Sequence, residues 1–454
     1  MNVTLSGQQI REQMCVNGIS SKSYVHRLLF AGALCENLSE ENPLLIRTNI
    51  FSEDMMATMN CLNALGACVI RREEGFVIVR GLKEAGTENC ELRAYCGESG
   101  STARFLLPLA ASLCKGKNTC YVDGGGRLTE RTNEALVTVL TEHGAVMSGN
   151  FLPIHVSGNL RPGVYEIPGN ISSQYITGLL ITLPTLDGDS EIRITTAIES
   201  AGYLDITLEV LAAFGIRIEK NAGGYHVPGN QRYLAPERII TEADWSNGAF
   251  VLALGAVKGQ VTVKGLNPES VQGDRAFVEI LKQFGGDIVF DGFDVTVTAR
   301  EMKAVDRDVS QVPDLVPALA CLALAAKGES CLRHVDRLRL KESDRVEAIL
   351  GLIRAFGGNA RTETDEATGF ENMYIEGKNT MPETVKNSRH SDIPDHITVD
   401  SCNDHRMVMA AVILQRAFDL KELTIQGAQA INKSYPGYFE ELELITCHLN
   451  WETK

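Results

Sequence analysis

Ser21-Lys22-Ser23-Tyr24-Val25-His26-Arg27 opens an apolar run from Leu28 to Leu34, and its pattern recurs along the whole chain. The run predicts a helix with two hydroxyls and two basic side chains in its first two turns. The first N–H groups of a helix have no partner within it, and the aligned peptide dipoles add positive potential there. Lys22 and Arg27 strengthen that potential, so the stretch predicts an anion site.

Five later polar clusters also precede apolar helical runs. They are Gly100–Arg104, Ser172–Tyr175, Asp244–Asn247, Asp314 and Asp404–Arg406. A strand-like run and a second helix follow each cluster. A single polar residue at a helix start is usually only an N-cap, but six similar starts indicate an internal repeat.

Glycines mark the ends of the second predicted helices. Gly66, Gly144, Gly215, Gly285 and Gly357 are 78, 71, 70 and 72 residues apart. Glycine directly after a periodic helix is the expected C-cap, and two β-like runs around a turn follow each one. The chain therefore reads as six copies of a βαβαββ unit of about 70 residues, which predicts an α/β fold.

The sixth copy lacks its final strand pair, and this predicts the role of the N-terminus. Val3–Leu5 and Gln9–Val16 flank a Ser-Gly turn and read as a hairpin that completes the sixth unit. The predicted domains are residues 1–20 with 242–454, and residues 21–241. The chain would cross between them twice at one hinge, which suits opening and closing over a cleft.

Composition narrows the class of protein. A length of 454 residues predicts two or three domains, and a formal net charge of −15 argues against nucleic acid or an anionic membrane as the main partner. The N-terminus has no signal pattern, and the apolar stretch Leu315–Ala326 is too short to span a bilayer. The twelve cysteines show no CxxC spacing, so they read as buried hydrophobes in a reducing cytoplasm, with a free thiol site as the alternative. We expect a cytoplasmic monomer.

Basic residues concentrate at four further turns or helix starts. These stretches are Asp123–Arg131, Arg337–Arg345, Asn403–Arg406 and Asn432–Pro436. Each alone could be a surface ion pair. Together, at equivalent ends of repeat units in an acidic protein, they indicate a small substrate with several negative charges, because Arg and Lys hold carboxylate and phosphate by charge-assisted hydrogen bonds.

The chain resembles the 5-enolpyruvylshikimate-3-phosphate synthase family over nearly its full length. Ten motifs occur in the family's order: Lys22-Ser23-x-x-x-Arg27, Ser99–Arg104, Asp123-Gly124-x-x-Arg127-x-x-x-Arg131, Ser172–Gln174, Ser200-x-x-Tyr203-x-Asp205, Gln272–Asp274, Pro313-Asp314, Lys341–Arg345, Asp404–Arg406 and Lys433–Pro436. The resemblance implies a two-domain inside-out α/β barrel with three βαβαββ units in each domain.

The resemblance also implies an activity: transfer of the enolpyruvyl group of phosphoenolpyruvate to the 5-hydroxyl of shikimate 3-phosphate, without metal or organic cofactor. By the family pattern, Ser172, Ser173, Ser200 and Lys22 would hold the shikimate phosphate. Ser23, Arg27, Asp314 and Lys341 would hold the ring hydroxyls and carboxylate. Gly100, Arg127, Gln174, Arg345, Arg406 and Lys433 would surround phosphoenolpyruvate.

The reaction needs one proton donor and one proton acceptor, and carboxylates beside cations can serve either task. Asp314 is the candidate base for the 5-hydroxyl. Glu342 is the candidate acid for the methylene carbon, with Lys22 as a contender. The plainer interpretations are that Asp314 is an N-cap and that Glu342 forms a surface ion pair with Arg345.

Three positions depart from the family pattern: Glu98 where the family usually has Asn, Thr132 where it has Pro, and Arg337 where it often has Asn. Glu98 would place an acid near an anionic substrate, and Thr132 would loosen a turn. These changes could weaken affinity, but the proton-transfer candidates remain, so we expect an active enzyme.

Three alternatives remain at this point. The sister transferase acting on UDP-N-acetylglucosamine typically carries a cysteine in the loop that is Gly124–Arg131 here, and this loop has none. The RNA 3′-phosphate cyclase has similar repeats but does not suit the acidic balance. A non-catalytic anion-binding repeat protein is the third possibility.

Overall fold

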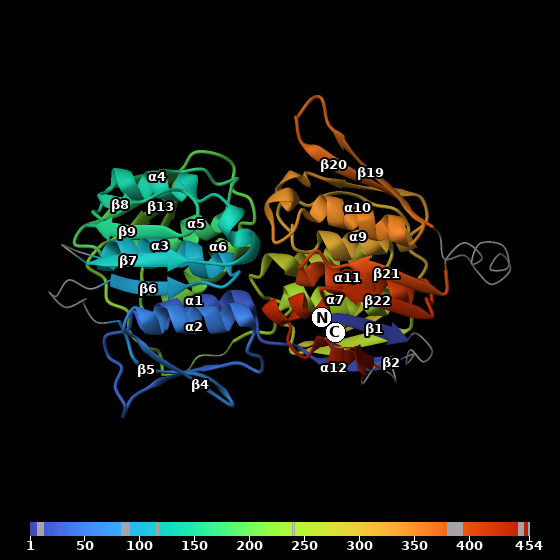
Figure 1. The fold of residues 1–454 in the computed structure, drawn as a ribbon, viewed down its shortest axis with the longest axis horizontal. Helices are drawn as coiled ribbons and strands as arrows, with labels where there is room; N and C mark the ends of the chain where they lie inside the picture. The colour runs from blue at the N-terminus through green and yellow to red at the C-terminus, as the bar shows by residue number, and fades with distance from the viewer. Residues whose placement is uncertain are drawn as a thin grey trace. The chain divides into compact units, whose positions relative to one another are not determined.

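The structure is a computed structural model of the chain and describes residues 1–6, 13–82, 91–114, 118–237, 239, 241–378, 394–443 and 449–452. It contains two compact units, shown in Figure 1. Unit 1 comprises Met1–Ile19 and Glu242–Lys454, and unit 2 comprises Ser20–Thr241.

Unit 2 holds repeats one to three. Its helices are α1 (Lys22–Ala33), α2 (Glu53–Ala64), α3 (Gly100–Leu113), α4 (Glu134–Glu142), α5 (Ser173–Thr182) and α6 (Gly202–Ala213). Its strands are β3 (Leu44–Arg47), β4 (Cys68–Arg72), β5 (Gly75–Arg80), β6 (Glu91–Tyr95), β7 (Thr119–Asp123), β8 (Ala145–Met147), β9 (Ile154–Gly158), β10 (Val164–Ile167), β11 (Ser190–Ile194), β12 (Glu219–Asn221) and β13 (Gly224–Val227).

Unit 1 holds repeats four to six. Its helices are α7 (Trp245–Val257), α8 (Phe277–Phe284), α9 (Val316–Ala325), α10 (Arg345–Ala355), α11 (His405–Ala417) and α12 (Tyr438–Glu443). Its strands are β1 (Asn2–Ser6), β2 (Gln13–Asn17), β14 (Gln260–Lys264), β15 (Asp287–Asp291), β16 (Asp294–Thr298), β17 (Asp306–Asp308), β18 (Glu329–Arg333), β19 (Asn359–Thr364), β20 (Glu371–Glu376), β21 (His396–Asp400), β22 (Glu422–Gln426) and β23 (Leu449–Glu452).

Each repeat builds one small sheet. In repeats two, three and five, the four strands lie in the order first, second, fourth and third, as in β6-β7-β9-β8. The first two strands are parallel, as β6 and β7 are, and the remaining pairs are antiparallel. The parallel pair needs a helix crossover, whereas the last two strands need only a short turn. Repeat one differs, because the described residues of its sheet form only β3-β5-β4.

The predicted N-terminal hairpin is wrong. β1 pairs with β22 and β23 in the sheet of repeat six, whereas β2 pairs in parallel with β14 in the sheet of repeat four. β1 therefore takes the place of the fourth strand in one repeat, and β2 takes that of the first strand in another. Gln9 of the predicted hairpin lies outside the described residues. Either segment fits its sheet because both alternate buried and exposed residues.

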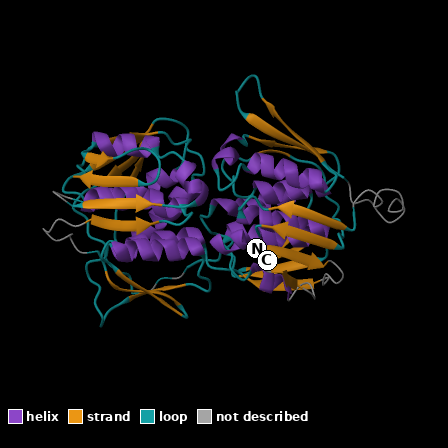
Figure 2. Ribbon diagram, in the orientation of Figure 1, coloured by secondary structure: helices purple, strands orange, loops and turns teal. Residues whose placement is uncertain are grey.

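The first helix of each repeat lies inside its unit. In unit 1, every residue of α9 and α11 and residues 245–256 of α7 are buried. These three helices have almost no face toward solvent, and they pack against one another. Figure 2 shows the strands of each unit on the outside of its helices. This arrangement confirms the predicted inside-out α/β fold of six repeats.

The predicted helix ends are confirmed at the glycines. Gly66, Gly144, Gly215, Gly285 and Gly357 all have positive φ, between 65° and 101°. This left-handed conformation closes a helix without the strain that a Cβ would cause.

Most of the predicted polar starts are also N-caps. Ser99, Ser172, Asp244 and Asp404 each accept a backbone N–H of the first helical turn. Asp314 does not: α9 begins at Val316 with Leu315 as its N-cap residue. Asp314 precedes the cap, so the interpretation of Asp314 as the N-cap of α9 is wrong.

Candidate active site

The charged residues at the helix starts of unit 1 form one cluster around Arg345. The Arg345 side chain is only 1% exposed, yet its guanidinium contacts three carboxylates: Nη1 lies 2.7 Å from Asp314 Oδ1, Nη2 lies 2.7 Å from Glu342 Oε2, and Nε lies 2.7 Å from Asp404 Oδ2. Arg345 begins α10, Asp404 caps α11, and Asp314 precedes α9. The repeat architecture therefore brings three helix starts to one buried arginine.

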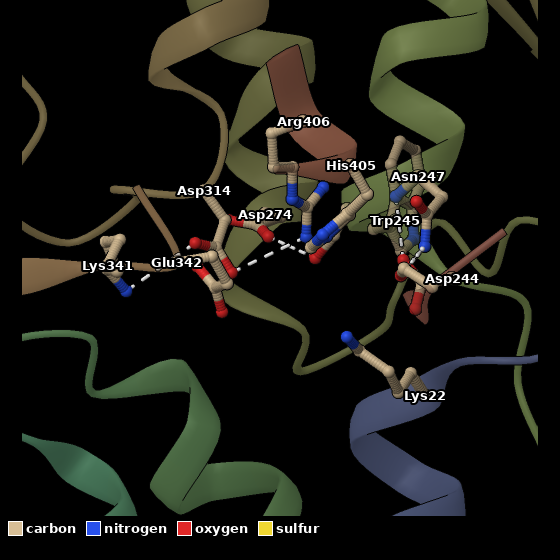
Figure 3. A network of polar contacts seen from close by, with 12 residues as sticks. Lys22, Asp244, Trp245, Asn247, Asp274, Asp314, Lys341, Glu342, His405 and Arg406 are labelled. Carbon is tan, nitrogen blue, oxygen red and sulfur yellow. Dashed lines mark hydrogen bonds and ion pairs between the residues drawn. The ribbon is translucent and has the colours of Figure 1, made fainter. Parts of the chain in front are cut away.

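Asp314 lies among three cations. Besides Arg345, Lys341 Nζ lies 3.5 Å from its Oδ1 and Arg406 Nη2 lies 3.5 Å from its Oδ2, as Figure 3 shows. Burial alone would raise the pKa of the Asp314 carboxyl, but Lys341, Arg406 and Arg345 together hold this pKa well below its usual value. Asp314 is therefore ionised at neutral pH, and it occupies cations that an anionic ligand could also use.

Lys341 lies in the turn between the 3₁₀ segment Asp336–Leu340 and α10. Burial lowers the pKa of its ammonium group, Asp314 opposes that shift, and Arg337 and Arg345 add to it. Arg337, a departure from the family pattern, therefore lies close enough to Lys341 to add to the positive potential there.

Arg406 and Asp404 are joined through the start of α11. Asp404 accepts the backbone N–H of Arg406 at 2.9 Å and the hydroxyl of Ser343 at 3.0 Å, while its other contact is Arg345. The Arg406 guanidinium lies over the Phe250 ring, 5.4 Å from its centroid. Asp404 thus caps α11 and holds the Arg345 guanidinium at once. The prediction quoted Asp404 within a motif but assigned it no role.

Asp274 is a second buried acid of unit 1. It accepts a hydrogen bond from the Ser246 hydroxyl at the start of α7. Burial and the nearby Asp314 raise the pKa of Asp274 to about 6, although Arg406 and Ser246 act in the opposite direction. The sequence offered only the motif Gln272-Gly273-Asp274 as a sign of this residue.

Lys433 and Glu342 are two further predicted site residues of unit 1. Lys433 is buried, and its ammonium donates to the carbonyl of Asn403 at 2.7 Å. Glu342 forms the ion pair with Arg345 that the plainer interpretation proposed, but the pair does not lie on the surface, because Glu342 is 27% exposed and Arg345 only 1%.

In unit 2, the start of α1 carries two basic residues with different surroundings. Lys22 Nζ lies 2.8 Å from Asp54 Oδ2 of α2, and both side chains are less than one-fifth exposed. The Arg27 guanidinium is buried and donates to Thr207 Oγ1 and to the carbonyls of Ser23 and Tyr203. Burial lowers the pKa of Arg27 to about 10, which leaves it charged at neutral pH. Asp54 has no counterpart in the prediction.

The N-terminus of α3 is surrounded by polar side chains. A Cβ at Gly100 would lie 3.1 Å from both Arg104 Nη1 and Arg131 Nη1, and 3.5 Å from Gln174 Oε1. Gln174 is the second residue of α5; its side chain accepts a hydrogen bond from Arg104 Nη1 at 2.5 Å and donates one to Ser101 Oγ at 2.9 Å. Gly100 therefore leaves space where two guanidinium groups and a helix N-terminus converge. Arg104 and Arg131 belong to two of the ten family motifs, but they are not among the site residues predicted from the sequence.

Three serines lie at the other helix starts of unit 2. Ser172 is the N-cap of α5 and accepts the N–H of Gln174, and Ser173 is the first residue of that helix. Ser200 precedes α6 with φ of 58°, a left-handed conformation that is uncommon for serine. All three are buried. Strain of this kind often occurs where a side chain must be aimed at a ligand.

Arg127 is the predicted residue with the most exposed setting. Its side chain is 40% exposed, and its Nε lies 3.7 Å from Oε2 of Glu130. Glu98 lies nearby, because a Cβ at the adjacent Gly126 would lie 2.5 Å from its carboxylate. Thr132 Oγ1 accepts the N–H of Glu134, so its hydroxyl supports the turn that we expected the missing proline to loosen.

The two groups of residues are suited to bind anions. Among the described residues, no set of three or more His, Cys, Asp and Glu side chains is arranged to hold a metal ion. Within the same part of the chain, none of the helices has the length and apolar character needed to cross a membrane.

The chain is similar to known proteins over nearly its whole length. The EPSP synthase (3-phosphoshikimate 1-carboxyvinyltransferase) family profile matches residues 8–442. A 3-phosphoshikimate 1-carboxyvinyltransferase from Clostridium acetobutylicum is 35% identical over 427 residues, covering 93% of this chain and 92% of the relative. One from Archaeoglobus fulgidus is 32% identical over 431 residues, covering 93% and 94%. The solved EPSP synthase from Acinetobacter baumannii superposes with a TM-score of 0.77 at 20% identity, covering 99% of both chains.

Proposed function

This chain belongs to the EPSP synthase (3-phosphoshikimate 1-carboxyvinyltransferase) family, and from that premise we propose how its charged residues divide the reaction. The reaction transfers the enolpyruvyl group of phosphoenolpyruvate to the 5-hydroxyl of shikimate 3-phosphate and releases phosphate. It is a step of the shikimate pathway to the aromatic amino acids. Both substrates carry a phosphate and a carboxylate, so their binding requires several fixed cations.

We assign shikimate 3-phosphate mainly to the helix starts of unit 2. Ser172, Ser173 and Ser200 would donate to the phosphate, and Lys22 would add a charge. Ser23 and Arg27 would contact the ring substituents, and we propose the same role for Asp314 and Lys341. The buried hydrogen bonds of Arg27 support this role, because they hold its side chain in one conformation before the substrate arrives.

We assign phosphoenolpyruvate to six residues: Gly100, Arg127, Gln174, Arg345, Arg406 and Lys433. Arg345 and Arg406 are the strongest candidates for its carboxylate, since both are nearly buried and guanidinium binds carboxylate in a bidentate manner. The space at Gly100 supports close approach of an anion to the N-terminus of α3.

Two proton movements accompany the addition step. The 5-hydroxyl oxygen attacks the carbon that bears the phosphate and loses its proton, while the methylene carbon gains one. Loss of a methyl proton and of phosphate then restores the vinyl group. We propose Asp314 as the acceptor of the hydroxyl proton, and Glu342 or Lys22 as the donor to the methylene carbon.

The environment of Asp314 bears directly on its role as a base. The cations that lower its pKa also make it a weak base in the free enzyme. When a substrate carboxylate binds Arg345 and Arg406, it neutralises the same charges, so the pKa of Asp314 should rise. Donor binding would thereby activate the base.

One observation carries the proposal: a buried arginine that gathers Asp314, Glu342 and Asp404 beside Lys341 and Arg406. The test is release of phosphate from phosphoenolpyruvate in the presence of shikimate 3-phosphate. UDP-N-acetylglucosamine in place of shikimate 3-phosphate should give none. Phosphate release with UDP-N-acetylglucosamine alone as acceptor would overturn the assignment.

We further propose a cytoplasmic, monomeric enzyme. The ten described cysteines are free thiols, and Cys61 Sγ lies 3.9 Å from Cys96 Sγ without a bond, which supports a reducing compartment. Cell fractionation tests the location, and sedimentation at several protein concentrations tests the monomer.

A further inference from the structure

A series of hydrogen bonds between buried side chains joins α1 to the N-terminus of α3 in unit 2. His26 Nδ1 lies 2.7 Å from Thr58 Oγ1 of α2, which lies 2.6 Å from Thr102 Oγ1 of α3. The Thr102 hydroxyl donates to Ser99 Oγ at 2.7 Å. All four side chains are at most 1% exposed, so water cannot replace any of these bonds.

The donors and acceptors of this series can be assigned. Ser99 Oγ accepts both the backbone N–H and the hydroxyl of Thr102. Because the Thr102 hydroxyl donates its one hydrogen to Ser99, it must accept a hydrogen bond from Thr58. The Thr58 hydroxyl therefore donates its one hydrogen to Thr102 and must accept a hydrogen bond from His26. His26 must then carry a hydrogen on Nδ1. A contact from Thr58 to the carbonyl of Asp54 is longer, at 3.4 Å, and competes weakly.

His26 is suited to remain a fixed donor. Burial, Lys22 and Arg27 lower the pKa of its imidazole, so the ring stays neutral. A neutral ring with hydrogen on Nδ1 leaves Nε2 as an acceptor, and this buried atom has no hydrogen-bond partner among the described residues. Among the described residues, the His26 ring therefore has a single polar contact, the hydrogen bond from Nδ1 to Thr58.

This series of hydrogen bonds connects elements that carry proposed substrate contacts. Lys22 contacts Asp54, and one helical turn later His26 contacts Thr58, so α1 and α2 are joined by two successive contacts. The Thr58–Thr102 bond then joins α2 to α3, whose cap Ser99 immediately precedes Gly100. These three helices pack against one another in unit 2, where Figure 1 labels them.

We propose that His26, Thr58, Thr102 and Ser99 are positioning residues that hold the N-terminus of α3 in register with α1 for binding of phosphoenolpyruvate. The inference rests on the proposed roles of Gly100 and Lys22. Hydroxyl chains in a low-dielectric interior polarise one another and admit few alternative geometries, so they fix positions more strictly than apolar packing does. Without these hydrogen bonds, the neighbouring apolar residues would still hold the helices together, but the distances between the helices would be less exact.

The test removes one link without changing its shape. Thr58→Val replaces the hydroxyl by a methyl group, and Thr58→Ser restores the hydroxyl. Loss of one such hydrogen bond should raise the KM for phosphoenolpyruvate about fivefold while kcat changes less than about twofold. Thr58→Ser should return the KM to near the wild-type value. Thr102→Val breaks the next link and should have the same effect, and the double variant should be no worse than the more impaired single variant.

Thr182→Val is the matched control. Thr182 is a fully buried threonine at the end of α5, and its hydroxyl has no hydrogen-bond partner in the part of the chain that the structure describes. Its substitution should leave both KM values unchanged. Wild-type turnover in the same assay tests the proposed function separately. If Thr58→Val is too unstable to assay, Thr102→Val and Thr102→Ser provide the same comparison.

Three results would overturn the proposal. One is a lower melting temperature without a change in the KM for phosphoenolpyruvate. Another is a Thr58→Ser enzyme as impaired as Thr58→Val. The third is an additive double variant, which would show that the two hydroxyls do not act in one series.

Discussion

Replacing Asp314 by Asn separates proton transfer from binding. Asn has nearly the same shape but cannot accept a proton. Arg345 would keep Glu342 and Asp404, each at 2.7 Å, so the cluster should hold its arrangement. Loss of a general base typically costs about 10² to 10⁴ in rate, or about 3 to 5 kcal/mol in activation free energy. We therefore expect kcat to fall by that factor.

Binding should respond differently from turnover. Asp314 occupies Arg345 and Arg406 in the free protein, so an uncharged Asn no longer competes with a substrate carboxylate for them. Affinity for phosphoenolpyruvate should be unchanged or tighter. Lys341→Met should show the opposite emphasis: a charge-assisted contact is lost in ground state and transition state alike, so shikimate 3-phosphate should bind about 10 to 100 times more weakly.

The measurements are kcat by phosphate release and equilibrium binding of each substrate by calorimetry. Asp274→Asn is the control, because it removes a neighbouring buried carboxylate that has no proposed role in proton transfer. An Asp314→Asn enzyme with near-normal kcat would remove Asp314 from the mechanism. An equal loss in Asp274→Asn would show that cluster charge matters, and not the base itself.

Three further predictions follow from single contacts. Because the pKa of Asp274 is raised to about 6, the contribution of this carboxyl to stability is present below pH about 4 and lost as the pH rises through about 6. The Asp274→Asn variant should therefore be more stable than the wild type at pH 8, by up to about 3 kcal/mol in urea titrations. An unchanged pH profile of stability would contradict this. Gly100→Ala should raise the KM for phosphoenolpyruvate about tenfold, because its Cβ would press on the ends of Arg104 and Arg131; an equal rise for shikimate 3-phosphate would argue against the assignment. Deleting residues 1–6 removes β1 from between β22 and β23; calorimetry should show that unit 1 loses its cooperative melting, and melting at the wild-type temperature would disprove the need for β1.

Local signals in the sequence were sufficient to predict the repeat. Glycine spacing and polar helix starts depend only on backbone conformation within a few residues, and both are confirmed at Gly66, Gly144, Gly215, Gly285 and Gly357 and at the caps Ser99, Ser172, Asp244 and Asp404. The period then predicted six units and an α/β fold. The family's motifs added the charged residues, both at those helix starts and in turns between elements.

The separation of β1 from β2 depended on the tertiary structure. A Ser-Gly turn between two alternating segments is a local hairpin signal, but the sheets of repeats four and six each take a strand from far along the chain. Pairing in two sheets buries the apolar face of each strand, and sequence alternation alone cannot distinguish this arrangement from a hairpin.

The buried partners of the site also emerged only from the fold. Arg345 is separated by 31 residues from Asp314 and by 59 from Asp404, so no local pattern shows that one guanidinium joins them. The same holds for Asp54 with Lys22 and for Thr58 with Thr102, whose bonds join different helices. The sequence alone determined which residue types stand at helix starts. Which of them meet was decided by three-dimensional packing, because a buried charge or hydroxyl is costly without a partner and that partner can lie far away in the sequence.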